Sequence, residues 1–405
     1  MVVSTMVVDF VRGKIMNILV IGNGFDLEHE LPTTYWEFLM FIKLTKKHNS
    51  WIGIKDNDVF KELNIHLQSL FEDQKYIETY SREKVKEFLG IVEHNIWIDY
   101  FLEKIDNKNE KNKGWIDFES EIANVIKGLD YVYRDHKRIG KGEIYQDELF
   151  NIADDFIYLS RKNMYVIEGF TVYDFCGEEG KKVIDIYLDN LTKFIRSLEI
   201  YLEEVVEKIN ISYRAKDIEK ISKIDKVLSF NYTYTYKKLY NNKAPYIEYD
   251  YIHGNLNSIG DNNMVLGIDE YLPDDEKNKY LEFIGFKKYF QRLYKKTSSQ
   301  YKHWIKELNS NEFEIGSKIY IFGHSLDITD KDVLQELILG TNKEEQVDNW
   351  SYYMFYNNVE IYIFYHNKEA FAQQITNLVK IIGQNQLIER VSDGKIKFIQ
   401  QSKHN

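Results

Sequence analysis

Asn17–Leu27, with the sequence NILVIGNGFDL, is the stretch that most constrains how this chain can fold. A short apolar run bounded by glycine, such as Ile18–Ile21, is typical of a strand buried on both faces. Gly22 and Gly24 then favour a tight turn, because glycine reaches backbone angles that other residues avoid. A strand, a glycine turn and a helix in this order predict the start of a Rossmann-like sheet, with a phosphate site at the turn.

The glycine turn does not by itself establish a ligand. Leu27 occupies the place of the third glycine in G-x-G-x-x-G, and a tight turn without a ligand explains Gly22–Gly24 as well. Asp26 is open to two interpretations, as the cap of the first helix or as a group in the ligand site. No lysine follows the turn at P-loop spacing, which argues against a kinase-like or NTPase site.

Composition narrows the class of protein. The 405 residues predict two or three domains of about 100–200 residues each. A net charge of −11 argues against a general nucleic-acid-binding surface. Cys176 is the one cysteine, so no disulfide can form within the chain. A chain without disulfides fits a reducing cytoplasm. No apolar run reaches the ~18 residues of a membrane span. We also expect residues 1–15 to be an extension upstream of a natural start at Met16.

The apolar pattern divides the chain into two kinds of segment. Residues 35–224 carry apolar residues mostly at helical spacing, as in Leu191, Phe194, Ile195 and Leu198. Short apolar runs typical of strands follow at 226–230, 246–252, 264–268, 318–322, 359–367 and 395–399. We therefore predict an α/β fold. Residues 16–34 and 225–405 would form a Rossmann-like core, a parallel sheet flanked by helices, and residues 35–224 a large, mostly helical insertion or lid after the first strand.

Polar residues or glycines follow several of these predicted strands. They are Asn231, His253, Asp269 and the group Gly323–Ser325. Ligands of open parallel sheets bind outside the carboxyl ends of the strands, so we expect these residues to meet Gly22–Asp26 around one crevice. Each also has a plainer explanation, since asparagine is a common turn former and a histidine at a strand end can simply bond the backbone.

Three further segments are ambiguous. Asp117 and Glu119 in WIDFESEI either cap an insertion helix or reach into the crevice. The segment 286–296, FKKYFQRLYKK, resembles single-strand nucleic-acid-binding sequence, but we interpret it as an amphipathic helix with its lysines on the face opposite the aromatic residues. In DITDKDVL we expect Thr329 to be the N-cap of a helix, within a capping box.

The motifs VIGNGFDLEHELPTTYWEFL, WIDFESEI, LSFNYT, HGNL and IYIFGHSLDITDKDVL resemble, in this order, the bacteriophage abortive infection AbiH family. The resemblance extends from residue 16 to about residue 370. It implies an anti-phage role inside a bacterial cell, with a phage-derived trigger or a partner defence protein, and does not state a reaction. The helical insertion and the acidic surface also suggest self-association.

A more distant resemblance implies chemistry. GNGFD, FNYT, HG and GHSL follow the order of motifs in sirtuin-like NAD-consuming domains, and place Asn231 and His253 at the catalytic positions. Thr233 stands where such domains often carry aspartate, and the absence of a cysteine zinc module argues against protein deacetylation. The residues that we expect to bind the cofactor are Gly22, Asn23, Gly24, Phe25, Asp269, Gly323, His324 and Ser325.

The resemblance therefore implies hydrolysis of NAD as substrate, without a metal. Asn231 would orient the ribose or a water, His253 would accept a proton, and Asp26 would stabilise positive charge on the ribose. We expect Asn231 and His253 at the surface of the crevice, where replacing them costs little stability. Two alternatives stay open. One is a module that only senses a nucleotide. The other is a metal-dependent phosphodiesterase or nuclease that uses Asp26, His253, Asp269 and His324.

Overall fold

The computed structural model describes residues 15–106, 116–139, 147–241, 246–256, 262–272, 281–309, 316–341 and 359–402. Residues 1–14, most of the predicted upstream extension, lie outside the described residues, as does Trp115 of the WIDFESEI motif.

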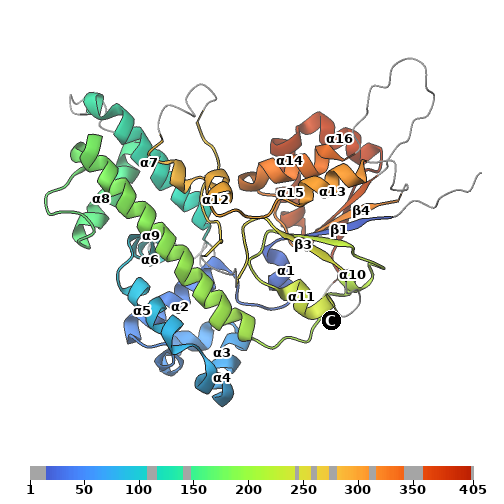
Figure 1. The fold of residues 1–405 in the computed structure, drawn as a ribbon, viewed down its shortest axis with the longest axis horizontal. Helices are drawn as coiled ribbons and strands as arrows, with labels where there is room; N and C mark the ends of the chain where they lie inside the picture. The colour runs from blue at the N-terminus through green and yellow to red at the C-terminus, as the bar shows by residue number, and fades with distance from the viewer. Residues whose placement is uncertain are drawn as a thin grey trace, which may run out of the picture.

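A parallel sheet of six described strands forms the centre of the fold (Figure 1). Its strands are β1 (Asn17–Ile21), β2 (Lys226–Ser229), β3 (Glu248–Tyr251), β4 (Lys318–Phe322), β5 (Glu360–Tyr365) and β6 (Ile396–Gln400). The order β3-β2-β1-β4-β5-β6 is that of dinucleotide-binding Rossmann folds, in which the order reverses beside β1. The predicted α/β, Rossmann-like class is confirmed.

Strand β1 lies in the middle of the sheet and pairs with a strand on each side. Val20 pairs with Leu228 on one side and with Ile321 on the other. All five residues of β1 are buried, and its side chains alternate between two hydrophobic clusters. Ile18 belongs to one cluster and Leu19 to the other. A strand that is apolar on both faces is therefore stable only between two layers of helices.

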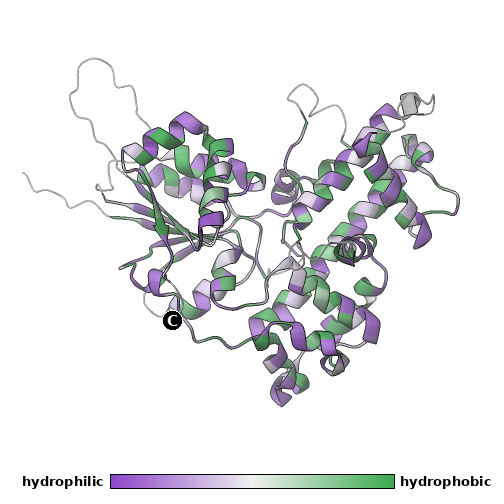
Figure 2. Ribbon diagram, turned by 180° about the vertical axis from the view of Figure 1, so that it is seen from behind, coloured by the Kyte–Doolittle hydropathy of each residue, from purple (hydrophilic) through white to green (hydrophobic). Residues whose placement is uncertain are grey.

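These two layers are visible in Figure 1. One layer comprises α13 (Tyr301–Leu308), α14 (Lys331–Gly340), α15 (Lys368–Ile382) and α16 (Gln384–Ser392). The other comprises α1 (Asn23–Glu28), α10 (Lys216–Glu219) and α11 (Thr235–Tyr240). Figure 2 shows hydrophobic and hydrophilic residues alternating along these helices, as expected for elements with one buried side.

A helical assembly with its own core lies beside the sheet (Figure 1). Its helices are α2 (Tyr35–His48), α3 (Ile65–Glu72), α4 (Gln74–Thr79), α5 (Arg82–Glu93), α6 (Ile96–Asp106), α7 (Phe118–Ile139), α8 (Glu148–Lys162) and α9 (Gly177–Glu204). Aromatic rings fill the core, with Phe118 4.5 Å from Phe101 and 5.0 Å from Phe194 between ring centroids. Domain boundaries at residues 34 and 225 stay a prediction.

The predicted strand at 264–268 is absent. Val265 N–H donates to the carbonyl of His253, Leu266 N–H donates to the side chain of Gln291, and Ile268 makes a single bridge to Lys287. The segment is buried against the helical core, so its backbone finds separate partners rather than a neighbouring strand.

The prediction for the basic segment 286–296 is also partly wrong. Helix α12 (Lys288–Tyr294) forms there, but Lys287 and Lys288 are only 3% and 2% exposed. Each lysine pairs with a carboxylate, Lys287 with Glu270 and Lys288 with Glu119, which compensates for the loss of water around the charge.

Gly323, directly after β4, allows a stability test. Its φ is +67°, and a Cβ atom there would lie 2.1 Å from the backbone nitrogen of Phe25. Gly394 has a similar φ of +70° but open surroundings. We expect Gly394→Ala to cost about 1–2 kcal/mol, the cost of left-handed backbone, and Gly323→Ala to cost more than about 4 kcal/mol. Thermal unfolding of both variants checks this, and equal losses would contradict the steric argument.

Candidate functional site

A cleft of about 720 Å³ lies at the carboxyl ends of β1, β2 and β4, between the sheet and the helical assembly. Its volume is in the range typical of small-molecule sites. Nine residues predicted from the sequence line it: Gly22, Asn23, Gly24, Asp26, Asn231, His253, Gly323, His324 and Ser325. The helical assembly contributes Trp36, Asp117, Glu119, Leu198 and Leu202 to the lining.

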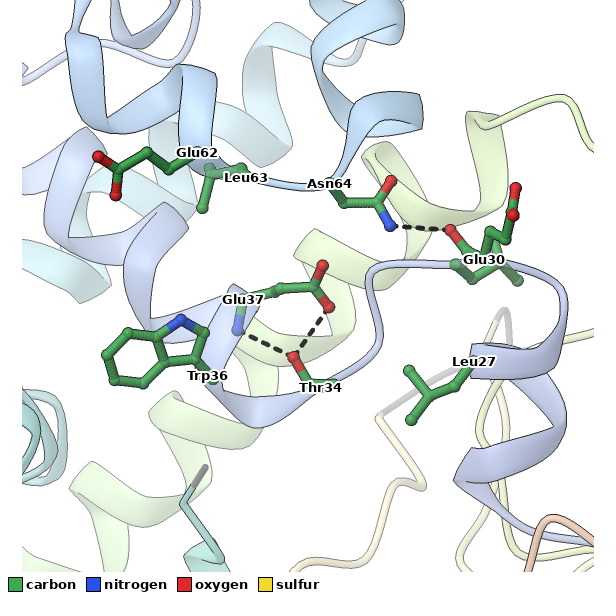
Figure 3. A pocket seen from close by; sticks show the side chains of 9 residues that line it. Leu27, Glu30, Thr34, Trp36, Glu37, Glu62, Leu63 and Asn64 are labelled. Atoms are coloured by element: carbon green, nitrogen blue, oxygen red, sulfur yellow. Dashed lines mark hydrogen bonds between the residues drawn. The ribbon is translucent and has the colours of Figure 1, made fainter. Parts of the chain in front are cut away.

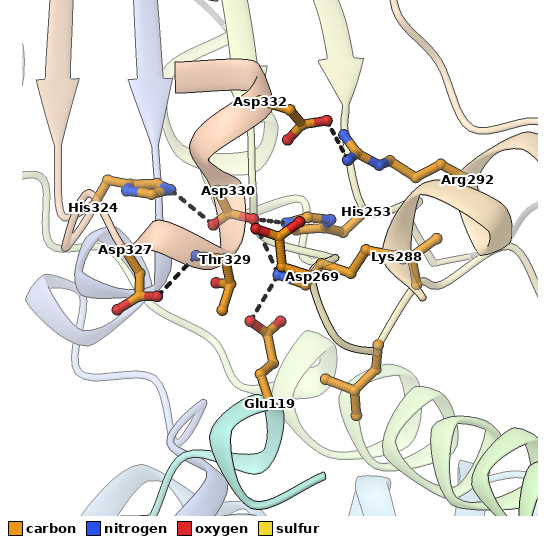
Figure 4. Close-up of polar contacts among 12 residues, drawn as sticks. Glu119, His253, Asp269, Lys288, Arg292, His324, Asp327, Thr329, Asp330 and Asp332 are labelled. Atoms are coloured by element: carbon orange, nitrogen blue, oxygen red, sulfur yellow. Dashed lines mark hydrogen bonds and ion pairs between the residues drawn. The ribbon is translucent and has the colours of Figure 1, made fainter. Parts of the chain in front are cut away.

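Two predicted site residues do not line this cleft. Phe25 is buried in the hydrophobic cluster under the sheet, with its ring 6.0 Å from those of Tyr236 and Phe322. Asp269 is exposed, and its Oδ1 accepts a hydrogen bond from Glu270 N–H. Its predicted strand does not form, and Asp269 lies beside the Lys288–Asp330 cluster rather than in the lining of the cleft (Figure 4).

The glycine turn after β1 packs directly on the turn after β4. Gly24 N–H donates to the carbonyl of Gly323 over 2.8 Å, and Gly22 N–H donates to that of Phe322 over 3.3 Å. Phe25 N–H bonds the carbonyl of Gly22. The glycines thus serve the close approach of two backbone segments, and the N–H groups of Gly22, Gly24 and Phe25 are bonded within the protein.

Asn231 follows β2 and fixes the glycine turn. Its Nδ2 donates to the carbonyl of Gly22 over 2.9 Å, and its backbone N–H bonds Ser229 Oγ. Asn231 and His253 line the cleft, as expected, but each is only 6% exposed, so protein encloses most of both side chains. Buried polar groups must be hydrogen-bonded, and Asn231 meets this requirement by bridging β2 to the turn after β1.

Asp26 is a buried carboxyl group at the base of the cleft. It is 1% exposed, its Oδ2 accepts from Thr233 Oγ1 over 2.6 Å, and its Oδ1 has no hydrogen-bond partner among the described residues. Burial raises the pKa of Asp26 to about 6, against the lowering effect of hydrogen bonds from Thr233 and Thr235. The side chain makes no cap bond to α1, which removes the capping interpretation.

His253 and His324 meet at one carboxylate, that of Asp330 (Figure 4). His253 Nε2 lies 2.9 Å from Asp330 Oδ1, and His324 Nε2 lies 3.5 Å from Oδ2. His324 Nδ1 accepts from Leu326 N–H, so the proton of His324 is on Nε2 and faces Asp330. Asp330 is at the end of the short 3₁₀ helix η8 (Ile328–Asp330), directly before α14.

The protonation of His253 follows from this pairing. Burial lowers the pKa of His253, against the raising effect of Asp330, so the ring is neutral at pH 7. An ionised Asp330 can only accept, which puts the proton on Nε2 of His253. Nδ1 then carries a lone pair, is buried, and has no hydrogen-bond partner among the described residues. A neutral imidazole held by a carboxylate is the arrangement of a general base.

Two charged groups complete this cluster. Lys288 Nζ lies 3.1 Å from Asp330 Oδ1 and 2.7 Å from Glu119 Oε2 (Figure 4). Burial alone would raise the pKa of Asp330, but Lys288 and the two histidines outweigh it and hold that pKa well below its usual range. Burial raises the pKa of Glu119 to about 7, although Lys288 lies against it. Asp117 caps α7 through Glu119 N–H, so of the two acidic residues Glu119 is the one that reaches the cluster.

Asp330 and Lys288 were not among the candidates from the sequence. The predicted N-cap at Thr329 is wrong, because Asp327 accepts from Thr329 N–H and Asp330 occupies the N-cap position of α14. An aspartate at a helix start usually caps the helix, but the side chain of Asp330 makes no cap hydrogen bond and pairs with Lys288 and the two histidines instead. One feature of the sequence could have indicated Asp330 as a site residue: it follows shortly after the predicted site residues Gly323–Ser325.

A second cavity of about 350 Å³ adjoins the cleft (Figure 3). The two share Leu27, Thr34 and Trp36 in their linings. Thr34 is the N-cap of α2 and bonds both the N–H and the carboxylate of Glu37. The start of α2 therefore forms the wall between the two cavities and places Trp36 along both.

Comparison with protein families matches residues 18–356 to Bacteriophage abortive infection AbiH. The chain belongs to the AbiH family. The family's description indicates a role in phage abortive infection, and the predicted AbiH resemblance is confirmed. No match to a curated protein or to a solved structure was found. The sirtuin-like resemblance stays a prediction.

This AbiH protein shows two absences among its described residues. No helix there has the length and apolarity to cross a membrane. Within the same residues, no three His, Cys, Asp or Glu side chains are grouped as metal ligands. The metal-dependent alternative uses Asp26, His253, Asp269 and His324. Of these four residues, Asp269 does not line the cleft.

The raised pKa of Asp26 predicts a pH-dependent stability. Folded Asp26 holds its proton up to about pH 6, and unfolded Asp26 only up to about 3.8. Above pH 6 the folded state therefore carries the full cost of a buried charge, on the order of 3 kcal/mol, and this cost fades as pH falls toward 3.8.

We expect Asp26→Asn to melt at a higher temperature than the natural protein at pH 8, with the gain shrinking by pH 4.5. Scanning calorimetry at both pH values measures it. The exposed Asp58→Asn is the matched control, and a gain from Asp26→Asn that does not change with pH would contradict the assignment.

Proposed function

We propose that this AbiH protein hydrolyses the nicotinamide–ribose bond of NAD in the bacterial cytoplasm, as its part in phage defence. The observation that carries the proposal is the pairing of His253 with the buried Asp330 in the cleft. It leaves Nδ1 of His253 as a basic nitrogen, in a cleft of suitable size at the switch point of a Rossmann-like sheet.

The reaction needs little acid catalysis. The C1′–N bond of NAD breaks with its electron pair on nicotinamide, which neutralises the pyridinium charge. Water forms the new bond to C1′ and gives its proton to His253 Nδ1, so the products are nicotinamide, ADP-ribose and one proton. A base that is neutral at the working pH suits this step.

The remaining difficulty is the positive charge that develops on the ribose. Asp26 supports the proposal here, because a carboxyl group with a pKa of about 6 is mostly ionised at pH 7. Its Oδ1 has no partner among the described residues, and a carboxylate in a dry site acts strongly on a nearby cation. Asn231 holds the turn beside it and orients the ribose.

The enzymatic test is incubation of the purified protein with NAD, with and without phage lysate, followed by chromatography of nicotinamide and ADP-ribose. We expect His253→Gln to lower the rate by ~10²-fold or more, as for loss of a positioned base. His303→Gln is the matched control, since His303 is an exposed histidine on α13 paired with Glu307.

Three outcomes would overturn this function. Equal nicotinamide release by the natural protein and His253→Gln would remove His253 from the reaction. Recovery of intact NAD bound to the protein, with no nicotinamide in the presence of lysate, would favour the nucleotide-sensing alternative. Loss of activity with a chelator would instead favour the metal-dependent hydrolase.

The rate should also depend on pH in a defined direction. The pKa of His253 is lowered from 6.5 by burial, so the base stays neutral down to a pH below 6.5. We expect kcat/KM to be level from pH 8 to 6.5 and to fall only below that, as His253 and Asp26 take up protons. Initial rates over this range measure the profile, and a midpoint above 6.5 would contradict it.

A further inference from the structure

Lys288 connects the helical assembly to the proposed catalytic residues. The side chain comes from α12, in the connection between β3 and β4, and is 2% exposed. Its Nζ bonds Glu119 on α7 over 2.7 Å and Asp330 on η8 over 3.1 Å. Lys288 is therefore the charge that joins the two sides of the cleft at Asp330 (Figure 4).

Asp330 can remain ionised in this place only with a counter-charge. Its oxygens face three donors, Lys288 and the two histidines His253 and His324. Among the described groups that contact Asp330, Lys288 is the one with a permanent positive charge, 3.1 Å from Oδ1. A buried carboxylate that loses its partner is strongly destabilised and takes up a proton instead.

Protonation of Asp330 would change the tautomer of the His253 ring. A carboxylic acid donates a hydrogen bond, whereas a carboxylate only accepts. Nε2 of His253 would then become the acceptor, and the ring proton would move to Nδ1. The lone pair at Nδ1, which is needed for proton transfer from water, would be lost.

We propose that Lys288 is a positioning residue that keeps Asp330 ionised and so fixes the tautomer of His253, with Glu119 tying this control to the helical assembly. The consequence for catalysis rests on the proposed function, whereas the tautomer of His253 does not. Lys288 acts through Asp330 and transfers no proton itself.

The neighbouring Lys287 offers a matched control. It is equally buried, at 3% exposed, and its Nζ lies 2.9 and 2.7 Å from the two carboxylate oxygens of Glu270. Neither Lys287 nor Glu270 lines the cleft. Lys287→Met and Lys288→Met thus remove the same charge from equally buried sites, and only Lys288→Met reaches Asp330.

Nitrogen NMR of protein labelled with ¹⁵N-histidine tests the tautomer without any substrate. The two ring nitrogens report separately whether they carry a proton, and His253→Gln assigns the signals among the ten histidines. We expect an unprotonated Nδ1 of His253 in the natural protein and in Lys287→Met, and a protonated Nδ1 in Lys288→Met. An unprotonated Nδ1 in Lys288→Met would overturn the proposal.

Steady-state rates give the second readout. Lys288→Met should lower kcat for NAD by ~10²-fold, with Lys287→Met unchanged, and equal rates for both variants would overturn the proposal. If the natural protein does not turn over NAD, the proposed function fails while the NMR result still decides the role of Lys288. If Lys288→Met does not fold, Lys288→Met combined with Glu119→Gln removes the second buried carboxylate and is read by the same NMR signals.

Discussion

The contact between the turns that follow β1 and β4 is the constraint on which the site depends. Two backbone segments touch there through Gly24 N–H and the Gly323 carbonyl, at the point where the strand order reverses. Side chains on either turn would separate the strand ends. Because β1 and β4 pair in register and end at this contact, the side chains that follow the neighbouring strands meet over it, with Asn231 bonded to the Gly22 carbonyl.

Above that contact the protein keeps several charges out of water. Asp26, Asp330, Glu119 and Lys288 are all largely buried, and together they carry more negative than positive charge. Such a cluster costs folding stability unless every charge is paired. Asp330 and Lys288 are paired, whereas one oxygen of Asp26 and one nitrogen of His253 are buried beside the cleft without a hydrogen-bond partner among the described residues. The unpartnered oxygen of Asp26 and nitrogen of His253 are the atoms that the proposed reaction uses.

The parts of this arrangement that could be predicted from the sequence are the local ones. The apolar run of β1, the glycine turns and the polar residues at strand ends all have local signals, and they brought Asn231, His253 and His324 to one cleft. Asp330 and Lys288 were missed for a different reason. A lysine is buried only because of partners distant in the chain, here Glu119 and Asp330, and no periodicity reveals them.

The predicted strand at 264–268, which does not form, also shows that local sequence does not reveal distant partners. Its composition is that of a strand, but the peptide groups of Val265 and Leu266 bond His253 and Gln291 instead of a neighbouring strand. Composition indicates which residues prefer to be buried, and the available partners decide the backbone conformation.

The position of β1 in the chain has a consequence for synthesis. Ile18 pairs with Lys226 and Ile319, so the first strand to leave the ribosome has no partner until more than half of the chain exists. At typical bacterial rates this delay is on the order of 10–40 s. Helices α2–α9 belong to a separate core, and the greater part of that core, all but its residues between Leu256 and Phe286, is synthesised in that interval. The apolar β1 stays exposed meanwhile, so the nascent chain is a natural client for chaperones that bind short hydrophobic segments.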